Sequence, residues 1–142
     1  MFSTSHIHPM LVHFPVALIL IGFLAELAAL VYKKEICLTK FGLYLLIAGN
    51  LAAIFTWLSG ALFTAKMEGA AGQIRETHEL IALTAVILAT ITSIIRIYII
   101  RQKEEKPGMK KIAFLFYVLT AIAIGLTGFF GGTLVYNYMM PL

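Results

Sequence analysis

Four long apolar stretches constrain the fold of this chain more than any other feature. They cover residues 10–32, 41–65, 80–100 and 112–138, and each is long enough to cross a hydrocarbon layer of about 30 Å as a helix of roughly 20 residues. Of the 142 residues, 61% are apolar and only 13% are charged, which excludes an ordinary soluble domain. We therefore predict an all-α integral membrane protein with one domain, residues 1–142, that is embedded in the lipid bilayer.

The connections between the stretches are short, so consecutive helices should be antiparallel neighbours in an up-down-up-down four-helix bundle. The basic residues then define its orientation. Two are in the connection between the second and third stretches, Lys66 and Arg75. The other nine flank the remaining two connections: Lys33, Lys34, Lys40, Arg96, Arg101, Lys103, Lys106, Lys110 and Lys111. The positive-inside rule places both termini outside, and the net charge of +4 needs no nucleic-acid partner.

A few polar and small residues lie inside the predicted spans. Glu26 and Arg96 are at similar depth, where a charged group is costly unless it is paired. We expect them to form a structural clamp, with a polar path as the alternative. Asn50 is expected to hydrogen-bond across to another helix. Gly128 and Gly132 form a GxxxG pattern, which favours close helix packing and a homodimer through the fourth span.

All four histidines fall at the outer end of the predicted bundle, and two separate segments supply them: His6, His8 and His13 in the first, and His78 in the second. Between His8 and His13, Pro9 suits the first turn of a helix, whereas Pro15 predicts a kink near His13. On a regular helix, two side chains five positions apart point about 140° away from each other. Only a broken helix could therefore bring both histidines together. We expect His13 to face the bundle interior. Thr77 is expected to cap the third helix just before His78, and His6 is the histidine least expected to take part.

Several motifs of the chain resemble the DUF2231 family of uncharacterised bacterial membrane proteins. They are the run at residues 8–18 with its two histidines and two prolines, Trp57 and Gly60 in the second span, His78, and the run at residues 131–136. The resemblance spans nearly the whole chain and implies the bacterial cytoplasmic membrane. It also implies a plan similar to the small b-type cytochrome membrane domains, with His8, His13 and His78 as ligands.

The first functional hypothesis is one noncovalent haem b at the outer side, ligated by His13 and His78. His8 is the substitute if His13 is only structural. Haem iron accepts two axial imidazoles, and helices of a bundle can supply them from opposite sides. The chain would then transfer electrons to redox partner proteins on the outer side. The expected propionate contacts are Arg75, Lys66, Tyr136 and Asn137.

Two other hypotheses stay open on the sequence. A copper or zinc site could use the histidines with methionine sulfur, its ligands being His8, His13, His78 and Met10, or the terminal Met139 and Met140. Alternatively, the protein is an accessory membrane subunit whose histidines only hydrogen-bond within the bundle. The chain carries no hydrolase or phosphate-binding motif, so the sequence leaves enzymatic activity open while favouring none.

Overall fold

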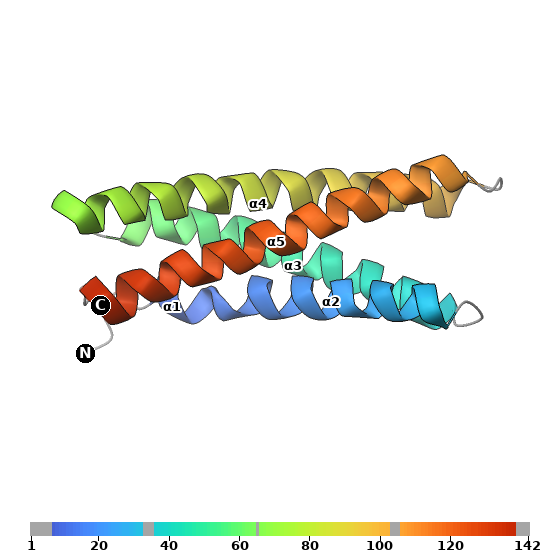
Figure 1. Ribbon diagram of the computed structural model, residues 1–142, viewed down its shortest axis with the longest axis horizontal. Coiled ribbons are helices and arrows are strands. Elements are labelled where there is room, and N and C mark those ends of the chain that lie inside the picture. The colour runs from blue at the N-terminus through green and yellow to red at the C-terminus, as the bar shows by residue number, and fades with distance from the viewer. Residues whose placement is uncertain (1–6, 33–35, 65, 103–105, 139–142) are drawn as a thin grey trace.

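The computed structural model describes residues 7–32, 36–64, 66–102 and 106–138, which are almost entirely helical. The helices are α1 (Ile7–Leu11), α2 (His13–Val31), α3 (Ile36–Phe63), α4 (Gly69–Arg101) and α5 (Pro107–Tyr138). Together α1 and α2 make the first of four helical spans that are long and apolar enough to cross a membrane. Consecutive spans run in opposite directions, and both termini lie at one end of the bundle, here called the terminal end (Figure 1). The all-α membrane fold is thus confirmed.

The first span has a one-residue break at Val12, close to the predicted kink. Pro9 and Pro15 each fall in the first turn of their helix, where a missing N–H is tolerated. Because Pro15 has no N–H, it cannot bond the Leu11 carbonyl; instead that oxygen accepts a hydrogen bond from Thr56 Oγ1 at 3.3 Å. The break is small, since the Val12 N–H still donates to the His8 carbonyl. A side chain of α3 therefore covers the irregular backbone.

The third span begins much earlier than its apolar residues indicate. We expected Thr77 to cap it, and that prediction is wrong: α4 starts at Gly69, and Thr77 Oγ1 donates to the Gln73 carbonyl inside the helix. The added turns are polar but rich in good helix formers such as Ala, Gln, Arg and Glu. Gly69 has a φ of 65°, a conformation that favours glycine, so it makes the tight turn from α3 possible. The candidate functional site lies near this extension.

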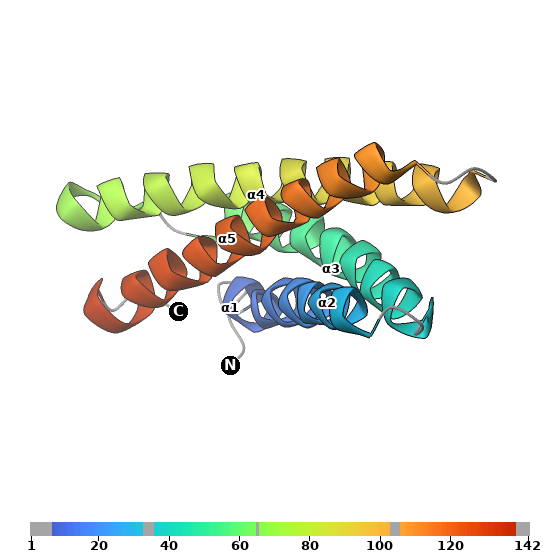
Figure 2. The same cartoon turned by 45° about the vertical axis from the view of Figure 1, so that its right-hand side comes forward.

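The bundle consists of two antiparallel hairpins, α2 with α3 and α4 with α5, while α3–α4 and α2–α5 contacts join them. Figure 2 shows α5 crossing α4 at a marked angle, so that the two helices diverge towards the terminal end. The interior is built largely of small side chains, among them Ala25, Ala53, Ala85, Ala89, Ala113, Ala121 and Ala123. Large apolar side chains such as Phe55, Ile94 and Phe129 point outward. Small residues inside and large apolar ones outside are typical of helices packed in lipid.

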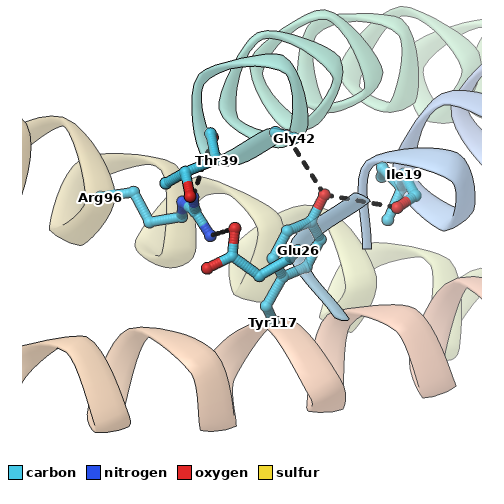
Figure 3. Close-up of polar contacts among 6 residues, drawn as sticks. All are labelled: Ile19, Glu26, Thr39, Gly42, Arg96 and Tyr117. Carbon is cyan, nitrogen blue, oxygen red and sulfur yellow. Dashed lines mark hydrogen bonds and ion pairs between the residues drawn. The ribbon is translucent and has the colours of Figure 1, made fainter. Parts of the chain in front are cut away.

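A charged cluster joins all four spans in the half of the bundle away from the termini. Arg96 Nη1 of α4 lies 2.6 Å from Glu26 Oε2 of α2, and both side chains are largely buried. Arg96 Nη2 also donates to the Thr39 carbonyl of α3 at 3.2 Å. The Arg96 guanidinium lies 5.7 Å from the ring centre of Tyr117, which comes from α5 (Figure 3). The predicted Glu26–Arg96 pair is confirmed, and its role as a clamp stays a prediction.

The prediction for Asn50 is confirmed as well. Asn50 of α3 is buried, and its side-chain oxygen lies 3.2 Å from Thr90 Oγ1 of α4. This contact is an interhelical hydrogen bond in the middle of the bundle. The hydroxyls of Thr84, Thr92 and Ser93 return to carbonyls four residues earlier in α4, so their own helix satisfies them.

Candidate functional site

A cavity of about 680 Å³ opens in the terminal half of the bundle. All four spans contribute to its wall. Most lining side chains are apolar or small, for example Val12, Val16, Ala53, Val86, Ile124 and Gly128. The polar groups on the wall include His8, Trp57, Arg75 and His78. An apolar hollow with a few polar groups is typical of a site for an organic ligand or cofactor.

His8 reaches this cavity from α1 and is fixed by α3. Its Nδ1 lies 3.0 Å from the Thr56 carbonyl oxygen and 3.0 Å from Ser59 Oγ. The Ser59 hydroxyl itself donates to the Thr56 carbonyl at 2.7 Å. Because a carbonyl oxygen only accepts, the contact with Nδ1 is a hydrogen bond when Nδ1 carries the proton. In the neutral ring, Nε2 is then the unprotonated nitrogen.

His78 is held in the same manner by the other hairpin. It lies on α4, and its Nδ1 is 3.0 Å from the Thr127 carbonyl oxygen of α5. Among the described residues, no hydrogen bond reaches Nε2 of either histidine. An imidazole that donates one N–H to a backbone carbonyl and keeps the other nitrogen free is in the state in which proteins usually present a metal ligand.

The two imidazoles are close to each other although 70 positions separate them in the sequence. Their ring centres are 6.4 Å apart and their planes are at 81°. Two imidazoles that bind one metal ion from opposite sides, with nitrogen–metal bonds of about 2 Å, have ring centres about 6 Å apart. The observed separation therefore matches that of a bis-imidazole pair.

The structure corrects the expectation for His13. We expected it to face the bundle interior opposite His78, but its side chain is exposed and lies at the rim of the cavity. The reason is that the break at Val12 is too slight to change the helix phase. His8 and His13 thus stay on different faces of the first span, and His8 is the one that meets His78.

Of the remaining predicted site residues, some line the cavity and others do not. Arg75 lines the cavity and lies 3.4 Å from Thr64 Oγ1 and 3.8 Å from Glu79. Tyr136 is at the wall but mostly exposed. Three other predicted residues are exposed and away from the cavity wall: Met10, Lys66 and Asn137. His6, Met139 and Met140 lie outside the described residues.

Several residues of the cavity wall were not among the predicted site residues. Gly128 and Gly132, which we expected to favour close helix packing, line the cavity, and a Cβ added to either meets no described atom closer than 3.9 Å. A homodimer through this helix stays a prediction. Trp57 also lines the cavity, and its buried Nε1 has no hydrogen-bond partner among the described residues. Its place as a lone tryptophan in an apolar span was a signal, but sequence alone did not show that Trp57 and His8 share one wall.

No group of three or more histidine, cysteine, aspartate or glutamate side chains comes together in a way that could hold a metal ion, as far as the described residues go. His8 and His78 form a pair, without His13 or an acidic residue as a third ligand.

Comparison with known proteins gives one finding. The family model described as "Predicted membrane protein (DUF2231)" matches residues 4–141, nearly the whole chain. No curated protein and no solved structure matches the sequence or the fold. The resemblance in the histidine, proline and glycine motifs is thereby confirmed, and the chain belongs to the DUF2231 family of predicted membrane proteins.

Proposed function

We propose that the cavity binds one b-type haem through Nε2 of His8 and Nε2 of His78, and that the protein transfers electrons at the outer face of the cytoplasmic membrane. The observation that carries the proposal is the geometry of the histidine pair. Both rings have Nδ1 within hydrogen-bond distance of a backbone carbonyl, both line the cavity, and their centres are 6.4 Å apart.

The number of protein ligands favours haem over a bare metal ion. A porphyrin supplies the equatorial nitrogens, so the protein needs to provide only two axial ligands. Zinc in proteins almost always takes four protein ligands in structural sites and three in catalytic ones. The tetragonal Cu(II) sites and the His₂Cys electron-transfer sites of copper proteins likewise use more than two donors. Among the described residues, His8 and His78 come together, and His13 at the rim does not join them in a group that could hold a metal ion.

The wall of the cavity also suits a flat, largely apolar ring with acidic substituents. Gly128 and Gly132 leave room at the cavity wall. Arg75 at the wall is a partner for a carboxylate, because guanidinium and carboxylate form strong charge-assisted hydrogen bonds. The buried N–H of Trp57 lacks an acceptor within the described part of the chain, and a bound polar group would provide one. When bound, haem would supply one-electron redox chemistry, while the chain holds and shields it.

The test is purification of the protein in detergent after expression with haem supply, followed by oxidised and reduced absorption spectra and metal analysis on the same sample. We expect a b-type spectrum at one haem per chain. A colourless protein that carries copper or zinc would replace this proposal with a metal site. A protein with neither would favour an accessory subunit whose histidines are structural.

A further inference from the structure

Each imidazole of the pair lies against a glycine of the neighbouring helix. His8 packs on Gly60 of α3, and His78 packs on Gly131 of α5. In both cases the glycine comes four residues after the threonine whose carbonyl accepts the Nδ1 hydrogen bond: Thr56 and Thr127. This coincidence has a simple cause in helix geometry.

In an α-helix the carbonyl of residue i points towards the N–H of residue i+4. The side chain at i+4 therefore lies beside that oxygen, which is why a threonine at i+4 can donate its hydroxyl to it. A Cβ on residue i+4 therefore stands between the carbonyl and an incoming ring. A Cβ at Gly60 would lie 2.9 Å from Cε1 and 3.2 Å from Nδ1 of His8. At Gly131 the corresponding distances to His78 are 3.1 and 3.5 Å. Glycine thus opens each carbonyl to its histidine.

The arrangement occurs once in each hairpin, at matching positions. The first helical span of each hairpin carries a histidine and, 18 positions later, a charged residue: His8 with Glu26, and His78 with Arg96. Eighteen residues are five helical turns of 3.6 residues, so both groups lie on one face. The second helix carries the threonine and the glycine. Two hairpins that hold their histidines by the same contacts present two equivalent ligands to one site.

We propose that Gly60 and Gly131 are the positioning residues of this site. By admitting the Nδ1–carbonyl hydrogen bonds, they fix the tautomer of His8 and His78 and direct both Nε2 atoms to the cavity. This inference rests on the proposed haem ligation for its functional meaning. The tautomer itself is a property of the chain without ligand, so it is testable separately.

The experiment compares Gly60→Ala and Gly131→Ala with Gly125→Ala, a matched control on α5. Gly125 is exposed, and a Cβ there meets nothing within 4 Å. Nitrogen NMR of ¹⁵N-histidine-labelled, haem-free protein in detergent reports which ring nitrogen carries the proton, with signals assigned from His8→Ala and His78→Ala. Equilibrium titration with haem then measures affinity. Gly131→Ala, where the clash is smaller, keeps the test open if Gly60→Ala does not fold.

We expect the wild-type protein and Gly125→Ala to carry the proton on Nδ1 of both histidines. Gly60→Ala should lose this state at His8 alone and Gly131→Ala at His78 alone, with haem affinity lowered roughly 10- to 100-fold, as for other groups that orient a metal ligand. If both variants keep the wild-type tautomers and bind haem like Gly125→Ala, the positioning role is overturned while haem binding stands. If the tautomers shift as expected but no form binds haem, the positioning role stands and the proposed function fails.

Discussion

His8 and His78 share a local environment that His13 lacks. Each of the two is half-buried at the cavity and donates Nδ1–H to a backbone carbonyl. His13 is exposed at the cavity rim. A free Nε2 with a fixed ring orientation is what metal ligation requires of an imidazole, so we propose His8 and His78 as the ligands and not His13.

Arg75 provides a test of how the cavity would bind the propionates of the proposed haem. Since Arg75 lines the cavity, Arg75→Ala should remove a charge-assisted contact with a haem propionate. We expect the dissociation constant for haem to rise about tenfold, which corresponds to about 1.4 kcal/mol. The measurement is a titration of haem into the apo protein. Lys66→Ala is the control because Lys66 is exposed away from the cavity wall; equal effects of the two variants would contradict a specific role for Arg75.

Residue types and spacings predicted the cluster of histidines at one end of the bundle, but they did not identify which histidine faces His78. That choice depends on the phase of the first span across Val12, and the retained Val12–His8 hydrogen bond keeps the helix nearly regular there. A proline pattern indicates that a break occurs without giving its angle. The role of Gly60 and Gly131 likewise appears only when the neighbouring helix is in place.

At the scale of helices, the buried pair of Glu26 and Arg96 holds α2 to α4. Arg96→Ala would leave the Glu26 carboxylate buried without its partner, and we expect the free energy of unfolding to fall by about 3 kcal/mol. The double variant Glu26→Leu/Arg96→Met should lose less, because it leaves no unpaired charge. Denaturant unfolding in mixed micelles measures both. Arg101→Ala, at an exposed position of α4, is the control, and a double variant as unstable as Arg96→Ala would refute the clamp.

The glycines of α5 supply a second prediction about a helix. Gly128 lines the cavity, and a Cβ there meets only Val16 at 3.9 Å. Because that Cβ overlaps no atom, Gly128→Leu should place its side chain in the cavity and abolish haem binding. The free energy of unfolding, measured on the same protein, separates this effect from a loss of folding. Gly125→Leu, at a position of α5 that does not line the cavity, should bind haem normally. A Gly128→Leu protein that binds haem as the wild type does would place the ligand elsewhere.

The number and order of the helices were predictable because an apolar stretch of about 20 residues has few other uses. The ends of the helices were less predictable: α4 begins at Gly69, eleven residues before the predicted span. Its first turns are polar and extend past the apolar stretch, so hydropathy gave no sign of them. The crossing of α5 over α4 (Figure 2), which accompanies the cavity, follows from packing between helices that sequence periodicity does not encode.

For the whole molecule, the basic residues predict the orientation in the membrane. Cys37, the single cysteine, is exposed in the first turn of α3, at the end of the bundle opposite to the termini. If the termini are outside, a membrane-impermeant maleimide added to intact cells should not label Cys37. A Cys37→Ala/Lys66→Cys protein should be labelled, because Lys66 lies at the terminal end. The opposite labelling pattern would invert the proposed orientation and move the histidine site to the cytoplasmic side.

The most direct test of the histidine pair compares absorption and electron paramagnetic resonance spectra of the haem-loaded wild-type protein with those of three single variants. His8→Ala and His78→Ala should each lose the six-coordinate, low-spin signature of two axial imidazoles, because each removes one ligand. His13→Ala should keep that signature at full haem content, since His13 is exposed and unpaired with His78. Loss of the signature in His13→Ala with its retention in His8→Ala, or its retention in all three variants, would contradict the account.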